Sequence, residues 1–195
     1  MRPARLPKLT PGRAYRTSDL AAWSSNPTRL AKRLVREGRL KRLRHGFFTV
    51  PTEGRWGPGS PSDAELLRAF LGGDRYVLTG PEYWNALGLG ATAVSPEQLV
   101  YNSKRSGTFE LDGRRFRLRR VALPRRVTPE WYAVDLLENH DLGGASLQQL
   151  EAGLAHALAE KRLSARRLEA AARSHGTRGT RELVERAKRR AGSQE

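Results

Sequence analysis

The chain has 195 residues, enough for one large domain or two small ones, and it carries a net charge of +16. A positive charge of this size favours an anionic polymer or an anionic membrane surface as partner. The absence of cysteine excludes disulfides, thiol nucleophiles and cysteine metal sites. No apolar run is long enough to span a bilayer, so we expect a cytoplasmic protein that meets nucleic acid and no membrane.

The positive charge is concentrated at the front of the chain. Residues 1–55 hold 14 of the 36 lysines and arginines but only 3 of the 20 acidic residues. A general arginine bias would spread the charge more evenly. The clustering predicts that the first quarter of the chain contacts a polyanion.

Two short helices are predicted after an N-terminal arm. Pro3, Pro7 and Pro11 predict an extended basic arm that carries Arg2, Arg5 and Lys8. Thr17 or Ser18 can cap a short helix that runs to Trp23, and Asp19 suits its positive end. Residues 24–26 interrupt the helical pattern, which predicts a turn.

The second helix is predicted from residue 28 to residue 37, with Pro27 at its first position, Asn26 or Ser25 as its cap and Gly38 as its end. At 100° per residue its apolar side chains share one face, and four basic side chains share the other. These four are Arg29, Lys32, Arg33 and Arg36. A solvated helix usually mixes charges of both signs, so this face predicts a phosphate partner.

A small basic hairpin is predicted directly after Gly38. Leu40 and Leu43 can face inward on one strand and Phe48 and Val50 on the next, with a turn at residues 44–46. Two helices joined by a tight turn and followed by such a wing describe a winged helix-turn-helix. The alternative is an unspecific basic unit packed within a larger domain.

Residues 54–61 are rich in glycine and proline and predict a linker between a DNA-binding domain at 1–53 and a second domain at 62–195. The second domain opens with a capping box at Ser62 and Glu65. Strands are predicted at residues 76–79 and 99–102, and the Asp112-Gly113 turn predicts a hairpin. Helices fill the remainder, so the predicted fold class is α+β, a winged helix-turn-helix followed by a mixed α/β domain with C-terminal helices.

The predicted hairpin around Asp112 is a second basic feature, with a row of arginines that comprises Arg115, Arg117 and Arg119, next to Arg114. Three interpretations stay open for it. It can extend the contact with DNA or touch RNA, it can steer an acidic protein partner, or it can be a plain solvated strand face.

No catalytic or cofactor motif is found. The four histidines lack partners at metal-ligand spacing, and no glycine-rich stretch is followed by Lys-Ser or Lys-Thr. Gly-x-Ser-x-Gly and the clustered acids of a nuclease are missing as well. We therefore expect a binding protein without enzyme activity, cofactor or metal.

Two separate segments resemble one known family. Residues 15–20, 33–40 and 42–48 resemble the N-terminal domain of AbiEi-type antitoxins, and residues 78–90 look like the opening of the second domain in that family. The Tyr101-Asn102 strand and the Asp112-Gly113 hairpin follow in the same order. The likeness covers about residues 13–140. The chain departs from the family in front of Thr17, where the three prolines leave little room for the usual leading helix.

The resemblance implies a transcriptional autorepressor that binds inverted repeats in its own promoter. It also implies a second domain that counteracts a nucleotidyltransferase-like toxin, AbiEii, of a bacterial toxin-antitoxin system of the type IV class, without requiring a stable complex with the toxin. The alternative is an RNA-binding or toxin-binding module without sequence-specific DNA recognition.

The predicted DNA contacts follow the order of the chain. At the first helix we expect Arg16, Thr17 and Ser18, at the second Asn26, Thr28, Arg29, Lys32, Arg33 and Arg36, and on the wing Arg42, Arg44 and His45. Asn26 and Thr28 would reach base edges or phosphate, the basic face would enter or flank the major groove, and the wing would lie on the neighbouring backbone or minor groove. His45 as an idle turn residue remains an alternative.

Overall fold

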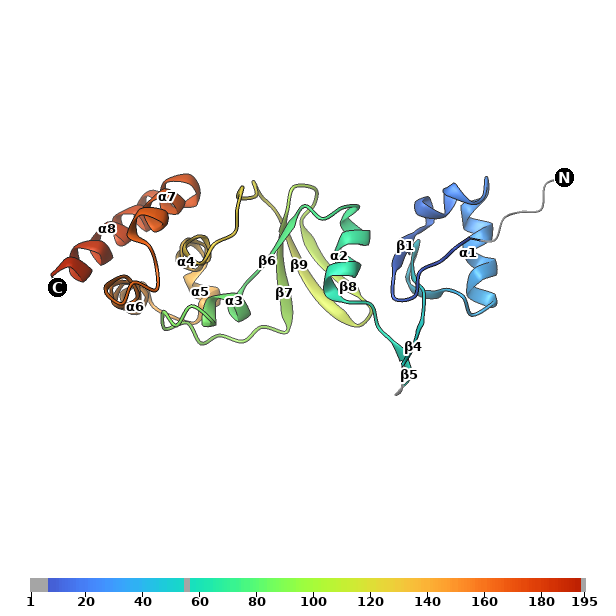
Figure 1. Cartoon of the computed structure of the whole chain (residues 1–195), viewed down its shortest axis with the longest axis horizontal. Helices are drawn as coiled ribbons and strands as arrows, with labels where there is room; N and C mark the ends of the chain where they lie inside the picture. Colours follow the sequence, from blue (N-terminus) through green and yellow to red (C-terminus); the bar gives the residue numbers. More distant parts are fainter. Residues whose placement is uncertain (1–6, 55–56, 194–195) are drawn as a thin grey trace. The chain divides into compact units, whose positions relative to one another are not determined.

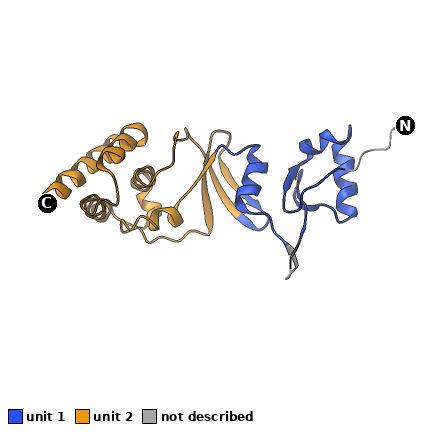
Figure 2. Ribbon diagram, viewed as in Figure 1, with its two compact units in different colours: residues 1–75, 109–114 blue, residues 76–108, 115–195 orange. Residues whose placement is uncertain are grey.

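The computed structural model describes residues 7–54 and 57–193 and divides the chain into two compact units (Figures 1 and 2). Unit 1 comprises residues 1–75 and 109–114, and unit 2 comprises residues 76–108 and 115–195. Helices and sheets occur together, which confirms the α+β class.

Unit 1 contains a three-stranded antiparallel sheet, two helical segments packed beside it, a two-stranded ribbon and a further helix. In chain order these are β1 (Ala14–Arg16), the 3-10 helix η1 (Thr17–Ala22), α1 (Pro27–Arg36), β2 (Lys41–Arg44), β3 (Phe47–Thr49), β4 (Thr52–Gly54), β5 (Gly57–Gly59) and α2 (Asp63–Leu71). The strand order of the three-stranded sheet is β1-β3-β2. The hydrophobic core beside this sheet includes Leu20, Leu30, Leu34, Leu40 and Phe48.

The division of the chain differs from the predicted domains at 1–53 and 62–195. Within residues 54–61, predicted as a linker, β5 pairs antiparallel with β4, while residues 55 and 56 lie outside the described part. Helix α2 and residues 109–114 group with unit 1. One reason is aromatic packing within that unit, because Phe70 contacts Phe47 and Phe109 with ring centroids 6.0 and 4.9 Å apart.

Unit 2 joins a mixed sheet to a set of helices. Its elements are β6 (Tyr76–Thr79), α3 (Pro81–Asn85), β7 (Glu97–Asn102), β8 (Gly107–Leu111), β9 (Arg114–Arg120), α4 (Pro129–Glu138), α5 (His140–Gly143), α6 (Leu147–Ala159), α7 (Ala165–His175) and α8 (Arg178–Gly192), the ends of β8 and β9 around the turn being counted in unit 1. The sheet order is β6-β7-β9-β8, with β7 parallel to β9. Helix α8 packs on α6 and α7, and α7 packs on α4.

Several local predictions for the segment after residue 61 have clear outcomes. The Ser62 hydroxyl accepts a hydrogen bond from the Glu65 N–H at 3.2 Å, which is one half of the predicted capping box. Helix α2 ends at Gly72, which has the left-handed conformation. Asp112 and Gly113 both have positive φ, as the Asp-Gly hairpin turn requires.

A buried carboxylate lies at the centre of unit 2. Asp135 of α4 accepts hydrogen bonds from the Thr79 hydroxyl, from Trp84 Nε1 at 3.0 Å and from the Tyr101 hydroxyl at 2.8 Å. Burial raises the pKa of Asp135 although these hydrogen bonds oppose the rise. Burial and the Asp135 charge likewise raise the pKa of Tyr101. The cluster connects α4 to β6, α3 and β7 through hydrogen bonds between buried polar side chains.

Candidate nucleic-acid interface

Helix α1 has the predicted buried face and ends at Arg36, one residue before the predicted end at residue 37. The Asn26 side chain accepts a hydrogen bond from the Arg29 N–H at 3.0 Å, Pro27 occupies the first turn, and Gly38 follows the helix with a φ of 69°. Leu30, Ala31 and Leu34 are buried against the core of unit 1. This packing sets which face of the helix reaches solvent.

The outer face of α1 is basic and exposed along its length. All four predicted side chains are exposed, namely Arg29, Lys32, Arg33 and Arg36. Arg33 has an acidic partner, Glu37, whose carboxylate lies 3.6 Å away. Within residues 7–54 and 57–193 the other three have no ion pair. Each pair of like charges four residues apart, such as Arg29 and Arg33, lowers the stability of a helix by about 0.2–0.5 kcal/mol. In the free protein this face of α1 is therefore a positive surface with little compensation.

The hairpin of β2 and β3 adjoins this helix in unit 1. Its turn is His45-Gly46, because Arg44, predicted as the first turn residue, still pairs with Phe47 as the last residue of β2. The pairing shifts register between Arg42 and Arg44. Arg42, Arg44 and His45 are exposed. The Thr17 N–H donates to the Gly46 carbonyl at 2.9 Å, which ties the start of η1 to the hairpin turn.

Two basic side chains of the hairpin are engaged within unit 1. The Arg44 guanidinium lies over the Phe70 and Phe109 rings at 5.4 and 5.7 Å from their centroids. Lys41 Nζ lies 3.3 Å from the Asp112 carboxylate. Arg44 therefore packs on aromatic side chains instead of extending freely, whereas no such contact is recorded for Arg42 in the described part of the chain.

The residues predicted at the first helix fall into different environments. Arg16, not Thr17 or Ser18, precedes the first turn of η1, and its backbone N–H and guanidinium both donate to Asp19 at 2.8 and 3.0 Å. Thr17 is half-buried, and Ser18 is exposed. Arg16 is thus held by an acid, which reduces its capacity to pair with phosphate.

The predicted N-terminal arm is partly packed. Pro7 is buried, and its carbonyl accepts a hydrogen bond from Arg39 Nη2 at 2.9 Å. Leu9 packs against the core of unit 1, while Lys8 is exposed. Arg2 and Arg5 lie outside the described residues. No helix precedes η1 between residues 7 and 16.

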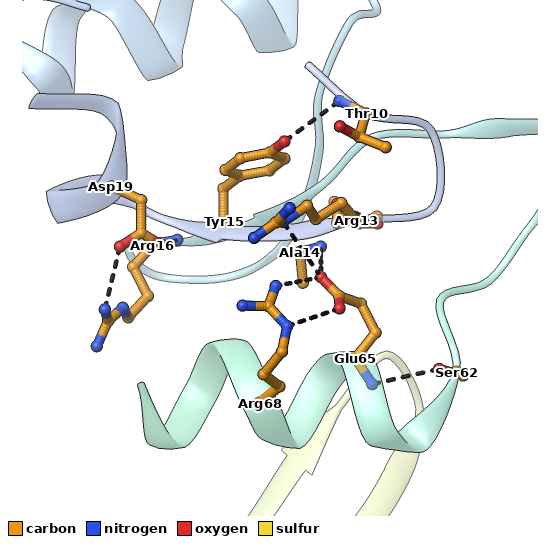
Figure 3. Close-up of polar contacts among 10 residues, drawn as sticks. Thr10, Arg13, Ala14, Tyr15, Arg16, Asp19, Ser62, Glu65 and Arg68 are labelled. Carbon is orange, nitrogen blue, oxygen red and sulfur yellow. Dashed lines mark hydrogen bonds and ion pairs between the residues drawn. The ribbon is translucent and has the colours of Figure 1, made fainter. Parts of the chain in front are cut away.

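The Glu65 carboxylate, predicted to complete a capping box with Ser62, instead contacts the edge strand β1 of the small sheet and Arg68 (Figure 3). The Ala14 N–H of β1 donates to Glu65 Oε1 at 2.8 Å, and Arg68 donates to both oxygens of the same carboxylate at 2.6 and 2.9 Å. Arg13 approaches it to 4.0 Å. Burial raises the pKa of Glu65, but the hydrogen bonds from Arg68 and Ala14 outweigh it, so the pKa lies below its ordinary value of 4.5.

Replacing Glu65 with glutamine keeps an oxygen for Ala14 but removes the charge that Arg68 and Arg13 contact. We expect the free energy of unfolding at neutral pH to fall by about 1.5–3 kcal/mol, the range for hydrogen bonds to charged groups. Because the folded pKa is lowered, this stability is present above pH 4.5 and is lost as the pH falls through the folded pKa. Urea denaturation at neutral pH and at roughly pH 3 measures both effects.

The matched control for this prediction is Glu110→Gln, which neutralises an exposed carboxylate of β8. It should leave the unfolding free energy nearly unchanged. A Glu65→Gln deficit that persists undiminished at acid pH would contradict the assignment to the ionised carboxylate.

The second basic feature is largely paired. Arg114 forms an ion pair with Asp63, Arg115 lies 3.8 Å from Glu97, and Arg119 Nη1 donates to Asn139 Oδ1 at 2.6 Å. Arg117 is exposed and has no recorded partner among the described residues. The row predicted along β9 therefore offers one unpaired guanidinium, whereas α1 offers three unpaired cations.

Two other kinds of feature, a metal site and a membrane span, are absent from the described residues. Among residues 7–54 and 57–193, no three His, Asp or Glu side chains are grouped as a metal site would require. In the same ranges, no helix combines the length and the apolar character that crossing a membrane demands.

Comparison with known proteins yields one structural neighbour. No family model matches the chain, and no curated protein matches it. The crystal structure of the Rv2827c protein from Mycobacterium tuberculosis is similar over 93% of this chain and 72% of that chain, with 16% sequence identity and a TM-score of 0.45. A likeness at this level does not define the fold of either unit.

Proposed function

We propose that unit 1 contains a winged helix-turn-helix that binds double-stranded DNA, with α1 as its recognition helix. The elements η1 and α1, the intervening residues 23–26 and the β2–β3 hairpin support this interpretation. The β1 strand, which pairs with β3, supplies the third strand beside the wing.

The observation that carries this proposal is the set of unpaired cations on α1. Arg29, Lys32 and Arg36 are exposed and have no ion pair in the described ranges, although the unit contains acids that pair with Arg16, Lys41 and Arg68 elsewhere. A surface that accumulates repulsion in the free protein is compensated when phosphates bind and release their counterions.

The contacts divide into specific and unspecific ones. We assign base contacts to Arg29 and Arg33, which are exposed in the first two turns of α1, and to Thr28, which is exposed at the helix start. Asn26 already uses its oxygen as the helix cap, so its amide nitrogen remains for a base or phosphate. Arg42 and His45 are assigned to the DNA backbone beside the recognition helix.

We further propose that the chain is a transcriptional autorepressor and antitoxin, acting in the cytoplasm by binding and not by catalysis. The resemblance of residues 15–48 and 78–90 to AbiEi-type antitoxins supports this part, and it assigns the counteraction of a nucleotidyltransferase-like toxin to unit 2. Co-expression of the full chain with a nucleotidyltransferase encoded beside it should restore growth. Growth arrest that persists despite abundant chain would refute the antitoxin assignment.

The alternative, an RNA-binding or toxin-binding module, depends on the arginines of β9. Arg115 and Arg119 are engaged with Glu97 and Asn139, which favours DNA as the first partner. Tighter binding to structured RNA than to DNA from the chain's own promoter would reverse this order.

Replacing Arg42 with alanine tests the backbone role of the wing. Loss of one phosphate contact should weaken binding to all duplexes alike and reduce the slope of log K against log salt by about one unit. Fluorescence anisotropy across a salt series measures this slope. Arg166→Ala removes an exposed charge from α7 in unit 2 and should not change the slope; equal slopes for wild type and Arg42→Ala would exclude Arg42 from the interface.

A further inference from the structure

An open pocket of about 430 Å³ lies in unit 2, where the loop after β9 approaches α4 and α7. Leu123, Pro124 and Ala171 form part of its apolar lining, together with Trp131. The volume falls within the range of about 300–1,000 Å³ that small-molecule sites occupy. The pocket can therefore hold a ligand with an apolar body.

The charged side chains that line this pocket are all basic. Arg125 and Arg126 are exposed, and neither has an ion pair within the described ranges. A third arginine, Arg167, has its Nε 2.9 Å from Glu130 Oε1, and the Glu130 side chain is 1% exposed. The buried Glu130 carboxylate thus neutralises Arg167, whose side chain is itself exposed. The described lining includes no acidic residue, so the charges of Arg125 and Arg126 remain uncompensated.

The start of α4 adds to the positive potential. Thr128, which lines the pocket, caps this ten-residue helix by accepting a hydrogen bond from the Trp131 N–H at 3.2 Å. Helix N-termini favour anions, and the effect is largest within the first turn. Glu130, in the same first turn, offsets part of this potential. The two guanidinium groups of Arg125 and Arg126, whose planar forks match the oxygens of a phosphate group, therefore provide the main recognition.

We propose that this pocket binds a small organic phosphate of the size of a nucleoside monophosphate. Arg125 and Arg126 hold the phosphate, and the apolar wall at Leu123 and Ala171 receives the organic body. The site lies wholly in unit 2 and does not depend on the DNA-binding proposal for unit 1.

Isothermal titration calorimetry of the full chain with adenosine monophosphate tests the proposal. We expect saturable one-to-one binding, and affinities at least about tenfold lower for adenosine, which lacks the phosphate, and for inorganic phosphate, which lacks the organic body. The double variant Arg125→Ala/Arg126→Ala should bind the nucleotide at least about tenfold more weakly. Both residues are exposed in a loop, so the melting temperature of this double variant should equal that of the wild type.

The matched control is Arg166→Ala/Arg190→Ala, which removes two charges from exposed positions of α7 and α8 outside the pocket lining. It should leave the affinity unchanged. If no binding is detected up to about 10 mM nucleotide, the dissociation constant is too high for a dedicated site, and the proposal is overturned. Equal loss in the two double variants, equal binding of adenosine, or equal binding of inorganic phosphate also overturns it.

Discussion

Replacing Arg29 and Arg33 together with alanine is expected to abolish the preference of this chain for its own promoter sequence. A well-placed bidentate contact between an arginine and guanine discriminates against a wrong base by about 1–3 kcal/mol. Losing two such contacts should reduce the specificity ratio by a factor of roughly ten or more for each residue. The ratio is measured by fluorescence anisotropy with the promoter duplex and a scrambled duplex of equal length.

The fold should tolerate this double substitution. Both side chains are exposed, alanine has the higher helix propensity, and the change removes one pair of like charges four residues apart, although Arg33 also loses its contact with Glu37. Arg166→Ala/Arg190→Ala removes the same charge from unit 2 and should preserve the specificity ratio. An unchanged ratio in the Arg29/Arg33 variant would contradict the assignment of α1 as recognition helix, whereas a nucleotide site in unit 2 would be unaffected by that result.

Replacing Asp135 with alanine is expected to produce the largest loss of stability among the substitutions considered. The change leaves the Thr79 hydroxyl, Trp84 Nε1 and the Tyr101 hydroxyl without their common acceptor. Each buried donor left without an acceptor costs about 1–3 kcal/mol, so we expect the unfolding free energy to fall by about 3 kcal/mol or more. Urea denaturation followed by tryptophan fluorescence measures this loss, because Trp84 is itself a member of the cluster.

The neighbouring Asp141 provides the control for this experiment, since its side chain is 91% exposed. Asp141→Ala should change the unfolding free energy by less than about 0.5 kcal/mol. A similarly small loss for Asp135→Ala would show that the three donors find other acceptors. In that case hydrogen bonds to Asp135 would not be needed to hold α4 against β6, β7 and α3.

Local chemistry was sufficient to predict much of the secondary structure. The Asn26 cap, Pro27 and Gly38 define α1, Ser62 and Gly72 define α2, and the Asp112-Gly113 turn defines the β8–β9 hairpin. Each of these signals acts through hydrogen bonds or backbone angles within a few residues. The local sequence therefore contains all the information needed to predict these helix ends and this turn. The basic face of α1 was predictable for the same reason, since the helical period alone places Arg29, Lys32 and Arg36 together.

Long-range pairing could not be predicted from these local signals. Residues 14–16, for which no strand is predicted, form β1 because β3 offers them a strand edge more than thirty residues away. The Glu65 carboxylate reaches the Ala14 N–H across 51 positions of sequence. No periodicity reports such a contact, because it depends on where α2 packs within unit 1.

The concentration of charge in the first 55 residues, with the spacing of basic residues on α1, was determined by the sequence alone. The tertiary structure decided which of the basic residues remain unpaired. It engages Arg44 with two phenylalanines, Arg16 with Asp19 and Arg115 with Glu97, and leaves the α1 face and the Arg125-Arg126 rim without acidic partners apart from Glu37. The physical reason is that an ion pair depends on the distance between two side chains in space, which composition and periodicity do not contain.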